Sequence, residues 1–208
     1  ADNKIDFQEF MIQPSGFNSF KSSLQCGVEI FHQLKEQLKQ RKLNTSVGDE
    51  GGFAPQLKSA EEALDLILQA IDVSGYKAGS QVFICLDCAS SELFDEEKYL
   101  LEGVEKSFNS AEMIRYLETL RSKYPISSIE DGLDEEDWDG WKVLTERLGS
   151  STQLVGDDIF ATNTNRIKKG IKQNIANSVL VKINQIGTIS EVMEAVNLSK
   201  ENSYKTVV

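Results

Sequence analysis

Short apolar runs that end in a charged residue recur along this chain. Four of them have the length and β-branched content of buried strands, and they cover residues 82–87, 126–130, 153–157 and 178–183. The first three end in a carboxylate, and the fourth carries a lysine. In the second run, Glu130 is predicted to be the last inward-facing residue, and Gly132 is predicted to let the chain turn away. One more strand is predicted over residues 5–14, where Pro14 ends it.

Between these runs, apolar residues recur at steps of three and four, which predicts amphipathic helices. Helices are predicted over residues 20–41, from a capping box at Ser59 to a stop at Gly75, over 110–123, 138–148 and 165–172, and from a capping box at Thr188. In the first helix, the stripe expected to face the core is Leu24, Val28, Phe31, Leu34 and Leu38.

Alternating strands and helices, with charged residues at the strand ends, are how a (β/α)8 barrel builds an active site at one mouth. Such a barrel usually needs about 250 residues, and this chain has 208. The sequence therefore predicts one α/β unit, a (β/α)8 TIM-like barrel truncated at both ends.

Three segments between the predicted elements have their own local chemistry. Residues 45–55 carry three glycines around an Asp-Glu pair, so they form either a polar turn or a mobile loop that presents Glu50 to a site. Residues 92–107 are charged and are predicted to form an inserted hairpin. The acidic run at residues 134–137 is interpreted as a helix start, where negative charge suits the helix dipole, without a catalytic role.

The net charge of −11, from 33 acidic and 22 basic residues, limits the expected partners. Such a surface repels nucleic acid and anionic membranes, and no basic stripe overrides it. We therefore expect no direct binding to either. No apolar run approaches the roughly 18 residues of a membrane-spanning helix.

The cysteines and the histidine predict little chemistry. Three cysteines form a sparse set that suits a reducing cytosol. Cys85 and Cys88 make a C-x-x-C motif, but residues three apart on a strand face opposite sides. Two packed thiols are therefore expected rather than a redox or metal-binding pair. His32, the only histidine, lies off the apolar stripe of its helix and is expected to be solvated.

Asp87, Glu130 and Asp157 are spaced as residues at the ends of successive barrel strands. Each one alone could be an unrelated strand-end acid, solvated or capping the next helix. Three carboxylates that meet in a low dielectric repel one another strongly, so a convergent trio needs a positive partner. Hard oxygen ligands without His or Cys favour Mg²⁺.

Lys182 is predicted to join this trio, because a lysine inside an apolar strand is expensive to bury unless it is paired or functional. Desolvation and a nearby divalent cation would both lower its pKa, which would make it a general base near neutral pH. The alternative is a structural salt bridge to Asp157 or Glu130.

Six segments resemble the motifs of the enolase family, in the same order and over the whole chain. They are residues 8–14 (QEFMIQP), 47–55 (VGDEGGFAP), 86–90 (LDCAS), 128–133 (SIEDGL), 155–158 (VGDD) and 181–187 (VKINQIG). The phrase DWDGW at residues 137–141 resembles bacterial members of the family.

The resemblance implies a reversible, Mg²⁺-dependent dehydration of 2-phosphoglycerate to phosphoenolpyruvate. It implies that Asp87, Glu130 and Asp157 bind Mg²⁺, and that Lys182 takes the proton from C2. It implies that Glu50 is the general acid for the leaving hydroxyl and that Glu9 supports it. Residues implied to bind the substrate are Gln8, Glu9, Glu130, Asp157 and Lys182. If Gln8 and Glu9 both contact the substrate site, that end of the strand must be irregular, because successive side chains on a regular strand point to opposite faces.

The same resemblance makes residues 1–208 part of a C-terminal catalytic barrel domain. Family members carry a small N-terminal α+β capping domain, a His-Arg-Ser loop and a further lysine that this sequence lacks. We therefore expect an active full-length protein and an inactive isolated piece. The family also implies a homodimer in the cytoplasm, with a secondary cell-surface or secreted pool. Alternative functions are a surface-exposed binding or adhesion role, or a superfamily lyase acting on another carboxylate.

Overall fold

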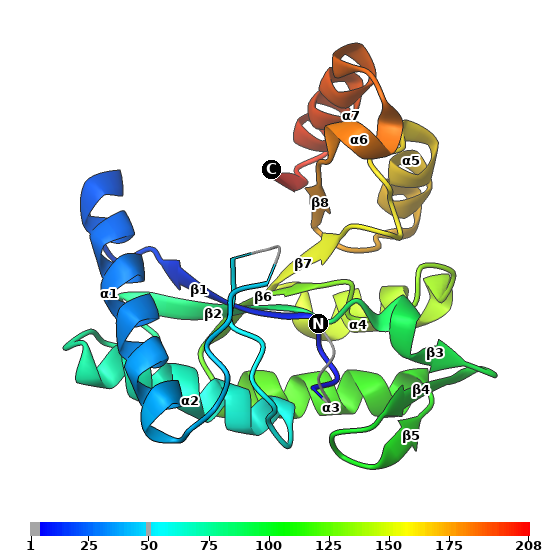
Figure 1. Cartoon of the computed structure of the whole chain (residues 1–208). Coiled ribbons are helices and arrows are strands. Elements are labelled where there is room, and N and C mark those ends of the chain that lie inside the picture. Colours follow the sequence, from blue (N-terminus) through cyan, green and yellow to red (C-terminus); the bar gives the residue numbers. More distant parts are fainter. Residues whose placement is uncertain (1–4, 49–50) are drawn as a thin grey trace.

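The computed structural model describes residues 5–48 and 51–208 and has a curled six-stranded sheet at its centre (Figure 1). The strands follow the order β1-β2-β6-β7-β8-β9. Their bounds are β1 Glu9–Pro14, β2 Val82–Asp87, β6 Ile126–Glu130, β7 Gln153–Gly156, β8 Ser178–Leu180 and β9 Lys205–Val207. The predicted α/β fold is confirmed, and β1 and β9 form the two edges of a barrel sheet that does not close.

The direction of the first strand was not predicted. Strands β2, β6, β7, β8 and β9 are mutually parallel, whereas β1 runs antiparallel to β2, with Glu9 opposite Asp87 and Pro14 opposite Val82. Two consecutive helices separate β1 from β2, so the first unit departs from the simple strand-then-helix repeat. Because β1 is reversed, its first residues lie at the same edge of the sheet as the last residues of β2.

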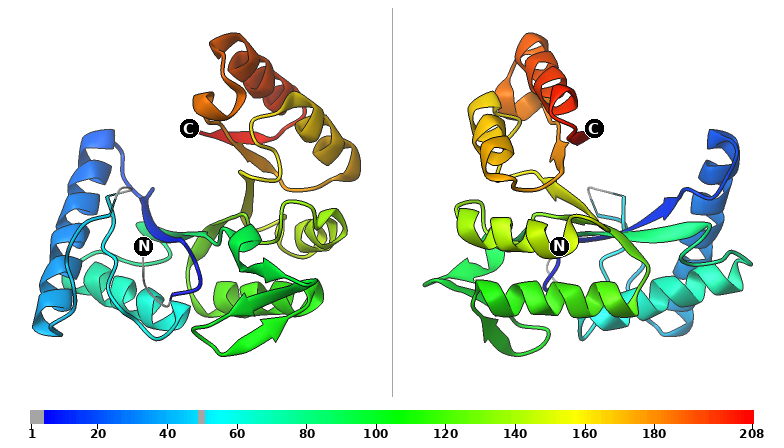
Figure 2. Two further views of the ribbon diagram at one scale, coloured as in Figure 1. Left: turned by 45° about the vertical axis from the view of Figure 1, so that its right-hand side comes forward. Right: turned by 180° about the vertical axis from the view of Figure 1, so that it is seen from behind.

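Helices lie outside the curve of the sheet (Figure 2). Their bounds are α1 Phe20–Gln40, α2 Ala60–Val73, α3 Ser110–Lys123, α4 Trp138–Leu148, α5 Thr164–Gln173, α6 Ile183–Ile186 and α7 Ile189–Glu201, with a 3₁₀ helix η1 at Ser90–Leu93. Ser59 and Thr188 are the N-caps of their helices, as expected: the Ser59 hydroxyl accepts from the Glu62 N–H, and the Thr188 hydroxyl accepts from the Glu191 N–H. The second bond of a capping box differs from the prediction, because Glu62 accepts from the Lys58 N–H and Glu191 from the Thr188 hydroxyl.

The predicted core stripe of α1 is wrong in its first half. Leu24 and Val28 are 55% and 47% exposed, while Cys26 and Ile30, on another face, are buried. Apolar residues occupy both faces of this helix, and the elements that pack against it decide which face is covered. His32 is exposed, as expected, and its ring meets Phe31 edge-on.

The segment predicted as a hairpin is a three-stranded antiparallel sheet, made of β3 Phe94–Asp95, β4 Lys98–Leu101 and β5 Lys106–Phe108. Its Tyr99 is buried, donates to the carboxylate of Asp137 at 2.8 Å, and accepts from the Asp134 N–H. Asp137 is also the N-cap of α4. The acidic run is therefore a helix start, as predicted, that also holds the small sheet in place.

The main core lies between the sheet and the helices. It contains Ile84, Leu86 and Ile129 from the strands, with Leu117 and Trp141 from α3 and α4, all fully buried. The three cysteines are free thiols. Of the two expected to be packed, Cys88 is buried, whereas Cys85 is only partly buried and its Sγ lies 3.6 Å from the Ser127 hydroxyl. In the part of the chain that the structure describes, no helix has both the length and the apolarity needed to cross a lipid bilayer.

Candidate active site and metal centre

The candidate site lies where the C-terminal ends of β2, β6, β7 and β8 meet. These four strands are direct neighbours in the sheet. Asp87 is the last residue of β2 and Glu130 the last of β6, while Asp157 follows β7 directly and Lys182 lies two residues after β8. The side chains predicted to converge are therefore carried by adjacent strand ends, and the charges of all three acids act on Lys182.

Asp87 is buried and is held by two donors. Its Oδ1 accepts from the Ala89 N–H at 3.0 Å, and its Oδ2 accepts from the Gln8 side-chain amide at 3.1 Å. Burial raises the pKa of Asp87 to about 6, and the charges of Glu9 and Asp157 act in the same direction. Gln8 lies in a bend just before β1. The irregular backbone required for Gln8 and Glu9 to reach one site is thus present.

Glu130 lies between the other two acids. Burial raises its pKa to about 8, and the charges of Asp87, Asp131 and Asp157 raise it further, while Lys182 lowers it. A carboxyl group with such a pKa is held among like charges with too little positive charge to balance them. This is the electrostatic environment that a bound cation would relieve.

Lys182 donates to Asp157 Oδ2 at 2.5 Å. Its side chain is 44% exposed, whereas that of Asp157 is 10% exposed. The prediction of a buried lysine within a strand is wrong, because β8 ends at Leu180 and Lys182 is the N-cap of α6.

The Lys182 pKa was predicted to be lowered by burial and by a nearby divalent cation; the direction of the burial effect is confirmed, and the effect of a cation stays a prediction. Burial lowers this pKa, but the hydrogen bond and charge of Asp157, together with the charges of Glu130 and Asp87, raise it overall. The salt bridge to Asp157 named as an alternative is present. It does not exclude a role as a base, because the pairing is to a candidate metal ligand.

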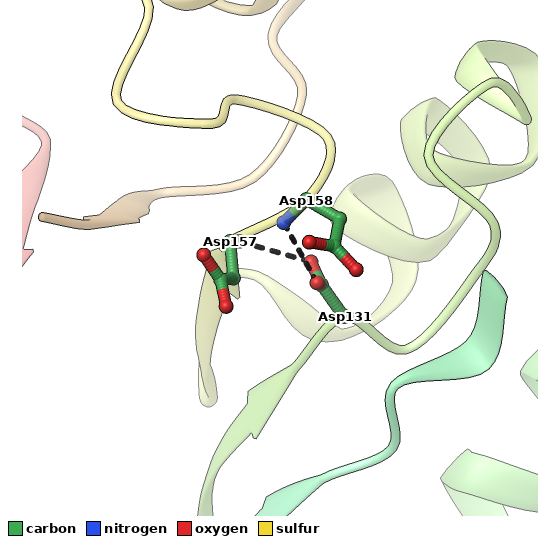
Figure 3. A group of neighbouring side chains, drawn as sticks. All are labelled: Asp131, Asp157 and Asp158. Carbon is green, nitrogen blue, oxygen red and sulfur yellow. Dashed lines mark hydrogen bonds between the residues drawn. The ribbon is translucent and has the colours of Figure 1, made fainter. Parts of the chain in front are cut away.

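The donor set fits a hard divalent cation. Asp87, Glu130 and Asp157 offer only carboxylate oxygens, which Mg²⁺ prefers. Among the described residues, however, the acidic group whose ligand atoms lie within 4.8 Å of one another is Asp131, Asp157 and Asp158 (Figure 3). The predicted trio is arranged more loosely, and its roles as metal ligands stay predictions.

Asp131 was missed by sequence reasoning. It is 4% exposed, and its carboxylate accepts from the N–H of Asp157 at 2.9 Å and from the N–H of Asp158 at 2.8 Å. Burial raises its pKa to about 8, although these two donors oppose the shift. The available signal was its place beside Glu130 at a strand end, which two adjacent carboxylates mark in the sequence.

The turn after β6 is made by Asp131 and not by Gly132, contrary to the prediction. Asp131 has a φ of 41°, in the left-handed region, while Gly132 does not have a positive φ. Gly132 lies in a tightly packed place: a Cβ there would lie 3.1 Å from Leu117 and 3.3 Å from Leu144, so these side chains would have to move slightly. Left-handed residues also follow β2 and β7, at Ala89, Ala161 and Thr162, and such conformations cluster at functional sites.

Thr162 and Gln185 were also missed. The Thr162 hydroxyl is fully buried, contacts Gln185 Oε1 at 2.8 Å, and accepts from the Lys182 N–H at 2.9 Å. The Gln185 amide donates to Asp157 Oδ1 at 2.7 Å. Both residues therefore orient the Lys182–Asp157 pair, and neither has a spacing that marks it in the sequence.

The glycine-rich segment is described only in part. Glu50, the predicted general acid, lies outside the described residues. Around it, Val47 pairs with Phe53 in an antiparallel bridge, and the Phe53 ring stacks on Phe31 of α1 with centroids 4.4 Å apart. The base of this segment is thus fixed to α1. The roles of Glu9, which lies opposite Asp87, and of Gln8 stay predictions.

The family comparison agrees with this architecture. The family model described as "Enolase, C-terminal TIM barrel domain" matches residues 1–208. The match covers every strand end that contributes to the candidate site.

Proposed function

Since the chain belongs to the enolase family as a C-terminal TIM barrel domain, we propose that it is the catalytic barrel of an enolase that interconverts 2-phosphoglycerate and phosphoenolpyruvate. Family membership makes it a lyase domain of the enolase superfamily. The observation that supports the proposed dehydration chemistry is that Asp87, Glu130, Asp157 and Lys182 lie at or just after four adjacent strand ends. The choice of an enolase within the superfamily rests on the sequence motif at residues 47–55.

Removing the proton next to a carboxylate is difficult, because negative charge accumulates on the substrate. A Mg²⁺ ion held by Asp87, Glu130 and Asp157 would act as a Lewis acid and stabilise that charge. Sites of the enolase superfamily carry out this chemistry by pairing a Lys or His base with Mg²⁺. Here the chain supplies three oxygen-donor side chains at one end of the sheet.

Lys182 is proposed to take the proton from C2 of the substrate. A lysine must be neutral to accept a proton, and the charge of Asp157 now raises its pKa. Any interaction that neutralises the charge of Asp157 therefore lowers the pKa of Lys182 and increases the fraction of neutral amine. The 44% exposure of Lys182 leaves its amine open to a ligand in the mouth.

Glu50 is proposed to protonate the leaving hydroxyl, with Glu9 in support and Gln8 beside the metal ligand Asp87. An acid and a base on opposite sides of the substrate suit the elimination of a poor leaving group. The motif that carries Glu50 favours an enolase over other lyases of the superfamily. The motif at residues 137–141 favours a bacterial type.

The test is the turnover of 2-phosphoglycerate by the full-length protein that carries this chain, followed by the ultraviolet absorbance of the enol product. We expect turnover with Mg²⁺ and none with a chelator. Outer-shell changes at metal sites cost about 10–100-fold, so Asp87→Asn, which alters a direct ligand, is expected to lower turnover by more than about 100-fold. Asp95→Asn, at the exposed last residue of β3, is the control and should leave turnover unchanged.

A protein that ignores 2-phosphoglycerate but dehydrates a non-phosphorylated hydroxy acid would contradict this proposal. It would indicate another lyase of the superfamily with the same base and metal ligands. We also propose a homodimer that works in the cytoplasm, from family resemblance. Light scattering of the purified full-length protein tests the dimer.

A further inference from the structure

Asp131 is a buried carboxylate that the proposed reaction does not use. It lies one residue beyond the end of β6, beside the candidate ligand Glu130. Figure 3 shows its side chain directed at the main-chain nitrogens of Asp157 and Asp158, while the Asp157 carboxylate is directed away from it. Each of the two hydrogen bonds links the end of β6 to the segment that follows β7.

The main chain of Asp131 makes further links between strand ends. Its N–H donates to the Val155 carbonyl on β7 at 3.0 Å, and its carbonyl accepts from the Ser90 N–H, just after β2, at 3.1 Å. The neighbouring Glu130 carbonyl accepts from the Cys88 N–H at 3.0 Å. One residue therefore joins the three strand ends that carry Asp87, Glu130 and Asp157.

Asp131 has an unusual backbone conformation that its hydrogen bonds hold in place. Its φ of 41° is sterically unfavourable for a residue with a Cβ. Aspartate adopts this region more readily than most residues with a Cβ, and here its contacts hold it there. The hydrogen bonds to both neighbouring strand ends are these contacts.

We propose that Asp131 is a positioning residue for the metal centre: its carboxylate fixes the main chain of Asp157 against Glu130 and so sets the spacing of the metal ligands. This inference rests on the proposed function, because it concerns the same ligands. In this proposal the two main-chain hydrogen bonds, one on each carboxylate oxygen, are the contacts through which Asp131 acts. Outer-shell partners that orient ligands in this way are typical of metal sites.

The chemistry of the two bonds explains why a carboxylate is needed. Asparagine has the same shape but offers one oxygen and one NH₂ group. In Asp131→Asn, one of the two main-chain N–H groups would face another donor, and the segment after β7 would shift. Glutamate keeps both oxygens but is longer, so Asp131→Glu would displace the same segment.

The experiment measures Mg²⁺ binding by calorimetry and turnover in the full-length protein, for the wild type and for Asp131→Asn. We expect Mg²⁺ affinity to fall about 10–100-fold and kcat to fall, with a smaller effect on KM. The matched control is Asp137→Asn. That carboxylate accepts from the Gly140 N–H and from the hydroxyls of Tyr99 and Ser110, away from the strand ends. The control should lose stability and keep its Mg²⁺ affinity.

Wild-type affinity and kcat in a folded Asp131→Asn protein would overturn the proposal. If that variant does not fold, hydrogen exchange of the wild type decides: the amides of Asp157 and Asp158 should be as protected as those of β7. Rapid exchange of both amides would overturn it. A wild type that binds Mg²⁺ but does not turn over 2-phosphoglycerate refutes the proposed substrate alone, since the calorimetric comparison still tests Asp131.

Discussion

The two sides of Asp157 are held in different ways. Toward β6, its main chain is bonded to the buried carboxylate of Asp131, and the strands are paired up to Glu130 opposite Val155. Toward β8, its own carboxylate is held by the side chains of Lys182 and Gln185. The first set of bonds is buried, whereas Lys182 is 44% exposed.

This difference separates a fixed part of the site from an adjustable one. Main-chain bonds between strand ends are difficult to break without opening the sheet, so the distance from Glu130 to Asp157 is preorganised. Side-chain bonds exchange by rotation about single bonds. Lys182, the proposed base, can therefore leave its carboxylate partner without moving any strand, which a proton-transfer group requires.

The largest effect is expected from removing the side chain of Lys182, the proposed base. General acid–base groups contribute about 10²–10⁴-fold to rates, so Lys182→Ala should lower kcat by about that factor while the fold persists. Steady-state kinetics in the full-length protein measures this. Lys169→Ala is the control, since that amine lies 3.5 Å above the Trp138 ring, outside the site. If Lys182→Ala keeps wild-type turnover, the base is another residue.

A smaller effect is expected from removing the Thr162 hydroxyl, which supports the Lys182–Asp157 pair. Thr162→Val keeps the shape but leaves the Lys182 N–H without its acceptor. An unsatisfied buried donor costs about 1–3 kcal/mol, so chemical denaturation should show a loss of that size. Turnover should fall less than in Lys182→Ala.

Thr162→Ser retains the hydroxyl and serves as the matched variant for this comparison. Its stability should lie close to that of the wild type. A loss in Thr162→Ser with none in Thr162→Val would show that the methyl group of Thr162, rather than its hydrogen bonds, supports the pair.

The smallest effect is a pH dependence on the β8–β9 side. Burial raises the pKa of Tyr204 to about 12, and its hydroxyl donates to the Ile175 carbonyl at 2.7 Å. Because the folded state favours the neutral phenol, its contribution is complete below pH 10 and is lost as the pH rises from 10 toward 12. The melting temperature of Tyr204→Phe should therefore fall less steeply with pH in that range than the melting temperature of the wild type. Parallel curves would contradict this assignment.

Much of the fold could be predicted because local signals and tertiary packing agree. The bounds of α3 and α4 match the prediction, and Asn109 and Asp137 cap these helices through side-chain bonds to the main chain. The stripe of α1 could not be predicted, because apolar residues lie on two of its faces and only the neighbouring elements select one. The reversal of β1 depends on its pairing with β2, which hydrophobic alternation does not encode.

The candidate site was predictable in its charged residues but not in their supports. Asp87 and Glu130 are marked by apolar runs that end in acid. The bonds of Asp131 and Thr162 cross to other strands, so they depend on which strands are neighbours and on how each chain end turns. The extent of β8 was overestimated for a similar reason, since the apolar residues Val181 and Ile183 continue the pattern after the strand has ended.

Because β1 is antiparallel to β2, residues 8–16 make contacts at both ends of the barrel. At one end, Gln8 donates to Asp87, seventy-nine positions later in the sequence. At the other end, the N–H groups of Ser15 and Gly16 both donate to the Gln81 carbonyl. Substitutions near Gly16 would thus change how this strand is anchored, and substitutions at Gln8 would change its contact with Asp87, so the two properties can be altered separately.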